Sequence, residues 1–189
     1  DLDFDLLRGG EQDRELVFGA VKKILEAHGE IKDSHIKRNT IFFLLSYGDA
    51  DHNVKVEVNI RMRIPGIKDH FELKEYLGIS MLVAKKSYLF ASKLAALTLR
   101  GETAMRDIYD IWYFAKNNWD IDAETLNIHA NKGVREHLAD CIALVEQVKD
   151  NQILRGLGEL LSEKEKAWVK THLRKEVVFL LRNYRSVLK

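Results

Sequence analysis

The chain has 189 residues, of which 46% are hydrophobic and 31% are charged, as is usual for a globular protein of one large domain or two small ones. The 30 lysines and arginines almost balance the 29 acidic residues, so the net charge of +1 gives no overall attraction to nucleic acid or to a membrane. The single cysteine excludes an internal disulfide, and no apolar run approaches the roughly 18 to 20 residues of a membrane span. We therefore expect a cytoplasmic protein with no membrane partner.

The first part of the chain predicts a small mixed α/β module, which we assign to residues 1–83. Its opening, DLDFDLL, alternates polar and apolar residues as a strand does, and apolar residues at helical spacing predict a helix over about residues 13–27. The runs TIFFLLSY and VKVEVNIRM predict two more strands, joined by the turn GDADHN. The first run is apolar throughout, so we expect both of its faces to be buried, whereas the second alternates.

After RIPGIKDH the pattern favours helices, and we assign residues 84–189 to a helical domain. We expect helices over about residues 87–100, 103–117 and 134–150, the first of them capped by Ser87. A last helix begins at SEKE, where Ser162 and Glu165 match a capping box, and runs nearly to the end of the chain. The predicted fold class is α+β, a mixed sheet followed by a C-terminal helical module.

The first predicted strand begins with acidic residues on one face. Asp1 and Asp3 are two residues apart, so their carboxylates project together. Adjacent carboxylates repel unless a cation lies between them, and Mg²⁺ binds a few carboxylates together with substrate phosphates. The alternative is a solvent-facing strand edge with scattered acids, and DLDFDL taken alone favours that alternative. Asp5, further along the strand, is interpreted as a bystander.

A further acid, Glu57, lies on the polar face of the valine-rich strand in VKVEVNI. A solvent-exposed acid is the common interpretation of such a residue. A neighbouring strand is also a natural place for a third ligand beside Asp1 and Asp3. An Asp-x-Asp pair with one acid on an adjacent strand is the layout of two-metal phosphoryl and nucleotidyl transfer, in which the metals align the attacking hydroxyl and hold the triphosphate.

Charged residues also cluster around the connection between two predicted helices, in KLAALTLRGETAMRDIYD. Lys93 and Arg100 are two helical turns apart and share a face, as do Asp107 and Asp110, and Arg106 is four residues before Asp110. The alternative is a solvated helix surface, on which each pair contributes only about 0.2–0.5 kcal/mol. These helices are otherwise strongly apolar, which sets the charged cluster apart.

Taken together, DLDFDL, the acid in the valine-rich strand and FASKLAALTLRGETAMRDIYDIWYF resemble the AbiEii/AbiGii nucleotidyltransferase-like family. Its members are the toxins of type IV toxin–antitoxin and abortive-infection systems. The family pattern is Asp-x-Asp, then a Lys…Arg helix, then Arg-Asp-x-x-Asp, and the resemblance covers about residues 1–115. It implies Mg²⁺-dependent transfer of a nucleotide from an NTP to an acceptor such as a tRNA or another RNA end, with a cognate antitoxin as partner. The alternative is a non-catalytic protein that binds a nucleotide or a partner on the same scaffold.

The resemblance also implies roles for single residues in the predicted α/β module. Asp1 and Asp3 match the catalytic, metal-binding pair of the family. Glu57 matches the third metal ligand only by its position in a strand.

In the helical part, Lys93 matches the lysine expected near the nucleotide phosphates, and is predicted to be both catalytic and nucleotide-binding. Asp107 is the predicted catalytic residue of Arg-Asp-x-x-Asp, where it would position or deprotonate the acceptor hydroxyl. The other predicted nucleotide-binding residues are Arg100, Arg106 and Asp110.

The sequence departs from the family pattern at its start. Family members carry a Gly-Gly-Ser/Thr-like element at a helix start shortly before Asp-x-Asp, where it grips the triphosphate. Gly9 and Gly10 follow the aspartates and do not substitute for it. We therefore expect the chain to be N-terminally incomplete and activity to require the longer protein.

Near the other end, the basic stretch KTHLRKEVVFLLRNYRSVLK is either a solvated helix face or a contact for RNA phosphates.

Overall fold

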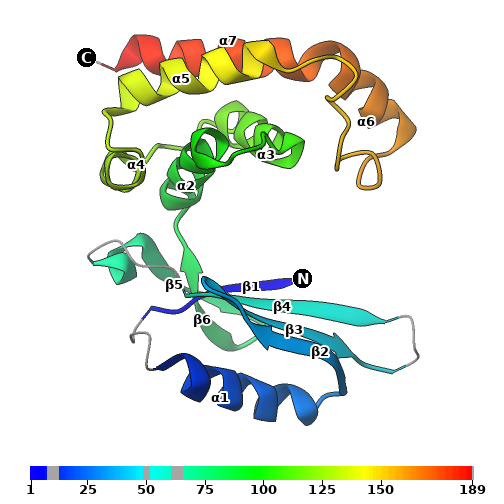
Figure 1. The fold of residues 1–189 in the computed structure, drawn as a ribbon. Helices are drawn as coiled ribbons and strands as arrows, with labels where there is room; N and C mark the ends of the chain where they lie inside the picture. Colours follow the sequence, from blue (N-terminus) through cyan, green and yellow to red (C-terminus); the bar gives the residue numbers. More distant parts are fainter. Residues whose placement is uncertain (8–12, 49–51, 61–65, 189) are drawn as a thin grey trace. The chain divides into compact units, whose positions relative to one another are not determined.

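The structure is a computed structural model that describes residues 1–7, 13–48, 52–60 and 66–188 (Figure 1). Gly9 and Gly10, the centre of the predicted GDADHN turn and the end of the VKVEVNIRM run lie outside the described residues. The chain divides into two compact units, Asp1–Lys68 and Asp69–Lys189, and each is described here by itself. The domain boundary predicted between residues 83 and 84 stays a prediction. The predicted α+β fold class is confirmed, with a mixed sheet early in the chain and helices after it.

The first unit is a four-stranded sheet with one helix against it. Its strands β1 (Leu2–Asp5), β2 (Glu30–Ile36), β3 (Thr40–Ser46) and β4 (Asn53–Asn59) lie in the order β1-β4-β3-β2. β1 is parallel to β4, and the other pairs are antiparallel. Helix α1 (Arg14–Glu26) packs on one face of this sheet, where Phe18 stacks on Phe43 with ring centroids 4.8 Å apart (Figure 1).

Two features of this unit differ from the sequence-based expectation. The strand β2 was not predicted, because EIKDSHI is largely polar and a register shift between Ile31 and Asp33 interrupts its alternation. In β3, Ile41 and Phe43 are fully buried beneath α1, whereas Phe42 and Leu44 on the other face are only half-buried. The prediction that both faces of β3 are buried is therefore wrong. The second face of the sheet carries the polar side chains of its neighbouring strands.

The second unit starts with a hairpin that the sequence analysis did not predict. A short 3₁₀ turn (Ile67–His70) leads into β5 (Phe71–Tyr76), which pairs antiparallel with β6 (Ile79–Ala84). Leu77 and Gly78 connect the two strands with φ angles of 51° and 78°. Positive φ at both turn residues is the geometry of a tight two-residue hairpin, and glycine at the second turn residue was the only local signal for it in the sequence of this turn.

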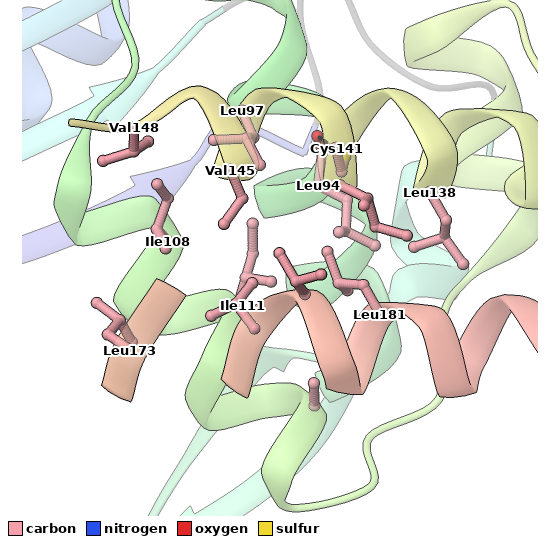
Figure 2. Close-up of a cluster of buried hydrophobic side chains, with 14 of the residues drawn as sticks. Leu94, Leu97, Ile108, Ile111, Leu138, Cys141, Val145, Val148, Leu173 and Leu181 are labelled. Atoms are coloured by element: carbon pink, nitrogen blue, oxygen red, sulfur yellow. Dashed lines mark hydrogen bonds between the residues drawn. The ribbon is translucent and has the colours of Figure 1, made fainter. Parts of the chain in front are cut away.

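Helices form the rest of the second unit, and their apolar faces meet in one core. Figure 2 shows this core, in which Leu94, Ile111, Leu138 and Leu181 come from four different helices and are fully buried. Cys141 lies in the same core, and burial raises the pKa of its thiol to about 12. The helices are α2 (Lys86–Leu99), α3 (Met105–Lys116), α4 (Ala123–Ala130), α5 (Val134–Gln147), α6 (Glu163–Trp168) and α7 (Arg174–Val187).

Of the two helix caps predicted in this unit, one is confirmed and one is wrong. Ser162 accepts a hydrogen bond from the Glu165 backbone N–H, and the Glu165 carboxylate accepts one in return, which confirms the capping box. The predicted cap at Ser87 is wrong, because α2 already begins at Lys86 and has no side-chain cap. The last predicted helix is interrupted by a π-helical turn, Val169–Leu173. Among the described residues, no helix is both long and apolar enough to cross a membrane.

Asp122 caps the unpredicted helix α4 and is expected to stabilise the second unit. Its carboxylate accepts a hydrogen bond from the Thr125 backbone N–H at 2.9 Å and lies 2.8 Å from Nδ1 of the buried His70. Burial opposes ionisation, but these hydrogen bonds outweigh it and lower the pKa of Asp122 below its usual value of 3.8. We expect Asp122→Ala to lower the free energy of unfolding at pH 7 by about 1–2 kcal/mol.

The pH dependence of that loss has a definite sign. A carboxyl group with a lowered pKa in the folded state contributes its stability above its unfolded pKa and loses it as the pH falls through the folded value. Urea denaturation of wild type and Asp122→Ala should therefore show a gap that is full at pH 7 and shrinks below pH of about 4. Asp120→Ala, at an exposed position nearby, serves as the matched control and should show no comparable gap. A gap that persists unchanged at pH 3 would contradict this assignment.

Candidate functional site

The predicted metal-binding carboxylates share the polar face of the first unit's sheet. Because β1 runs parallel to β4, Asp3 is paired with Glu57 and Asp5 with Asn59 in adjacent positions. Residues two apart in a strand point to the same side, so Asp1, Asp3 and Asp5 face the same way. The strand pairing thus brings the Asp-x-Asp pair and Glu57 onto neighbouring strands of one surface.

Lys55 lies among these carboxylates, and the sequence analysis did not single it out. Its Nζ is 3.2 Å from Asp1 Oδ2 and 3.0 Å from Glu57 Oε2. Asp5 accepts a hydrogen bond of 2.7 Å from the Asn59 amide, which is compatible with its interpretation as a bystander. The Asp3 carboxylate has no hydrogen-bond or ion-pair partner within the described ranges. A lysine two residues before the predicted ligand Glu57, on the same strand face, was the available signal.

The chemistry of these side chains fits a hard divalent cation, because Mg²⁺ prefers a few carboxylate oxygens together with phosphate oxygens. The side chains are not gathered as a closed metal site. Across the part of the chain that the structure describes, no three His, Cys, Asp or Glu side chains come together closely enough to hold a metal ion. Instead, the Lys55 ammonium contacts two of the three predicted ligands, Asp1 and Glu57.

The second group of predicted residues meets where α2 ends and α3 begins, within the second unit. Asp107 in the first turn of α3 is only 2% exposed. Lys93 donates a hydrogen bond of 3.0 Å to its Oδ1, and Arg100 Nη1 lies 2.6 Å from its Oδ2, an ion-pair contact without hydrogen-bond geometry. Lys93 Nζ is also 2.7 Å from Asp110 Oδ2. Four of the predicted residues therefore form one charge cluster.

This cluster determines the charge state of Lys93. Burial by itself lowers the pKa of the ammonium group, but the hydrogen bonds to Asp110 and Asp107 outweigh burial and raise the pKa above its usual value of 10.5. Lys93 is therefore a fixed positive charge at neutral pH. Both oxygens of Asp107 face cations, an arrangement suited to positioning Lys93 and Arg100. The predicted action of Asp107 on an acceptor hydroxyl stays a prediction.

Arg106 differs from the other cations of this motif. It is exposed on α3, and its guanidinium has no hydrogen-bond or ion-pair partner in the described parts of the chain. Its guanidinium can therefore contact an anionic ligand without first leaving a carboxylate.

Farther along the chain, in the basic C-terminal stretch, Arg174 donates a 2.6 Å hydrogen bond to the Val148 carbonyl and Arg182 lies 2.6 Å from Glu146. Those two charges hold the helices together.

The family comparison extends the resemblance seen in the motifs. The family model described as nucleotidyl transferase AbiEii toxin of the type IV toxin–antitoxin system matches residues 1–177. The chain belongs to the AbiEii family. The AbiEii match includes most of the helical unit, beyond the part of the chain to which the motifs were confined. No protein with a curated description is similar enough to match the chain.

Two crystal structures from Helicobacter pylori resemble this AbiEii-family chain. One, described as a candidate nucleotidyltransferase, is 17% identical and has a TM-score of 0.50, with 96% of this chain and 79% of that chain covered. The other, JHP933, is also 17% identical and has a TM-score of 0.49, with 98% of this chain and 78% of that chain covered. At this identity the first likeness supports the fold alone, and it agrees with the mixed sheet and helical module of this AbiEii-family member.

Proposed function

We propose that this AbiEii-family chain is a cytoplasmic, Mg²⁺-dependent nucleotidyltransferase toxin. It would transfer a nucleotide from an NTP to an RNA end, such as that of a tRNA, and a cognate antitoxin would neutralise it. Family membership supports the class of reaction. The observation that carries the residue assignment is the parallel pairing of β1 with β4, which sets Asp3 directly beside Glu57 on the polar face of the sheet.

In this proposal the carboxylates of the first unit bind the metal. Asp1, Asp3 and Glu57 would supply oxygen ligands from two neighbouring strands, whose backbone hydrogen bonds keep the spacing of the ligands constant. Bound there, Mg²⁺ would activate the acceptor hydroxyl and neutralise charge on the triphosphate and the leaving pyrophosphate. Asp3, which has no counter-ion among the described residues, is the ligand most available for this role.

The cations of the second unit would bind the nucleotide. The Lys93 ammonium stays protonated because Asp107 and Asp110 raise its pKa. The Arg106 guanidinium is exposed and has no partner in the described ranges. Both are suited to phosphate oxygens, the arginine through two parallel hydrogen bonds. Arg100 and Asp110 would complete this nucleotide-binding group, with Asp107 holding Lys93 and Arg100 in position.

A second candidate function is a non-catalytic protein that binds a nucleotide or a partner on the same scaffold. The contacts of Lys55 favour it, since an ammonium already compensates two of the three carboxylates that catalysis would need. The first function predicts both nucleotide binding and transfer, whereas the second predicts no transfer and predicts nucleotide binding only if the ligand of the scaffold is a nucleotide.

A labelling experiment separates the two functions. The complete gene product is incubated with each α-labelled NTP and total RNA, with Mg²⁺ or with EDTA, and the RNA is then resolved by size. We expect label on RNA with Mg²⁺ and none with EDTA, and less label when the cognate antitoxin is added. Mg²⁺-dependent NTP binding by calorimetry without any labelled RNA would favour the binding function, and the absence of both NTP binding and transfer would reject the transferase and leave only a scaffold that binds a partner.

A further inference from the structure

Lys55 is positioned to act as a counter-ion of the carboxylate face. Its ammonium is within 3.2 Å of Asp1 on one strand and within 3.0 Å of Glu57 on its own strand. β4 is hydrogen-bonded on both sides, by β1 and by β3, so the backbone that carries Lys55 cannot shift without breaking the sheet. Its neighbour on β3 is Leu44, which offers the ammonium no competing acid.

We propose that Lys55 is a resident cation that restrains metal binding until a nucleotide arrives. With the face empty, its ammonium joins Asp1 and Glu57 and relieves their repulsion. A divalent cation needs the same carboxylate oxygens, so it binds only when the ammonium withdraws. The phosphates of an NTP offer the ammonium a new anionic partner, which makes the exchange easier when metal and nucleotide bind together. This inference rests on the proposed metal-dependent function.

The ion pairs of Lys55 with Asp1 and Glu57 are weak enough for a divalent cation to replace the ammonium. The side chains of Lys55 and Glu57 are 34% and 35% exposed, and that of Asp1 is 62% exposed. Ion pairs at such half-exposed positions are weak, because water screens the charges and competes for the same atoms. The ammonium can therefore withdraw without disturbing the fold, and yet it places a positive charge where the divalent cation would bind.

The inference predicts tighter metal binding when the ammonium is removed. In Lys55→Gln we expect Mn²⁺, used as a paramagnetic substitute for Mg²⁺, to bind the nucleotide-free protein about tenfold more tightly than in wild type. The gain in Mn²⁺ affinity on adding a non-hydrolysable NTP analogue should shrink by a similar factor. Lys55→Arg, which keeps the charge, should resemble wild type. Free Mn²⁺ is measured by electron paramagnetic resonance in the complete gene product.

Controls locate the effect on the carboxylate face. Lys32→Gln removes a lysine that pairs with Glu30 on β2 of the same sheet, and it should leave Mn²⁺ affinity unchanged. Asp3→Asn introduced into Lys55→Gln should abolish the gained affinity. Thermal unfolding of every variant checks that the fold is retained.

The outcomes distinguish the inference from the function on which it rests. If wild type binds Mn²⁺ with the NTP analogue but Lys55→Gln changes no Mn²⁺ affinity, Lys55 is only a surface ion pair and the inference alone is overturned. If neither wild type nor Lys55→Gln binds Mn²⁺ with or without the analogue, the proposed metal-dependent function fails as well. Mn²⁺ binding by Lys55→Gln that survives Asp3→Asn would also overturn the inference, because the metal would then be bound elsewhere.

Discussion

Asp3→Asn is expected to reduce transfer of labelled nucleotide to RNA by about a thousandfold or more, because losing a charged metal ligand removes several kcal/mol of transition-state stabilisation. Asp3 lies beside Glu57 across the β1–β4 pair and has no counter-ion among the described residues. The amide keeps the volume of the side chain and removes the charge that a divalent cation needs. Initial rates of transfer with saturating Mg²⁺ and NTP measure the effect.

Asp5→Asn is the matched control for this experiment. Asp5 lies on the same strand and the same face, but its carboxylate is engaged by the Asn59 amide at 2.7 Å. We expect this variant to retain transfer within a few-fold of wild type. The substitution changes only the acceptor of the exposed hydrogen bond from the Asn59 amide, from a carboxylate to an amide oxygen. Equal losses in both variants would show that the acidic strand acts as a whole, and an active Asp3→Asn would remove Asp3 from the site.

Asp107→Ala is expected to lower the free energy of unfolding by about 2–3 kcal/mol, near the lower end of the cost of breaking a buried ion pair. Asp107 is 2% exposed and contacts both Lys93 and Arg100. Those cations are 34% and 53% exposed, so water compensates part of the loss. Urea denaturation at pH 7 measures the difference.

Asp110→Ala removes a carboxylate from the same cluster and provides the comparison. Asp110 is 38% exposed and its only ion-pair partner among the described residues is Lys93, so its loss should cost less than about 1 kcal/mol. A similar loss of stability in both variants would contradict the view that Asp107 is the buried anchor of the cluster. Asp107→Asn, which keeps the volume of the side chain, separates the loss of charge from the effect of a cavity.

Local patterns in the sequence determined much of the secondary structure and part of the site. Alternation in DLDFDLL and VKVEVNI predicted two strands and showed which of their side chains share a face, because successive residues of a strand point to opposite sides. The capping box at Ser162 and Glu165 likewise located a helix start. The motif order alone was enough to suggest the family to which the chain belongs.

Strand pairing depended on contacts between distant parts of the chain, and no local pattern specifies such contacts. Asp3 and Glu57 lie side by side only because β1 adds to the sheet parallel to β4. Alternation places Lys55 on the same strand face as Glu57, but its contact with Asp1 depends on the pairing of β1 with β4 and could not be read from the sequence. The polar strand β2 was missed because pairing with β3, more than local propensity, stabilises it. The β5–β6 hairpin was missed because its turn, Leu77-Gly78, is not one of the residue pairs that usually mark a hairpin.

In the charge cluster between α2 and α3 too, local sequence patterns determined one part of the arrangement and tertiary packing determined the other. Helical spacing determined that Lys93 and Arg100 share one face and that Asp107 and Asp110 share another. Only the packing of the two helices brought these faces together and buried the Asp107 carboxylate between two cations. The sequence by itself therefore determined which charges are available, and the tertiary structure decided which are neutralised within the protein and which remain for a ligand, because burial and ion pairing arise only when separate elements pack.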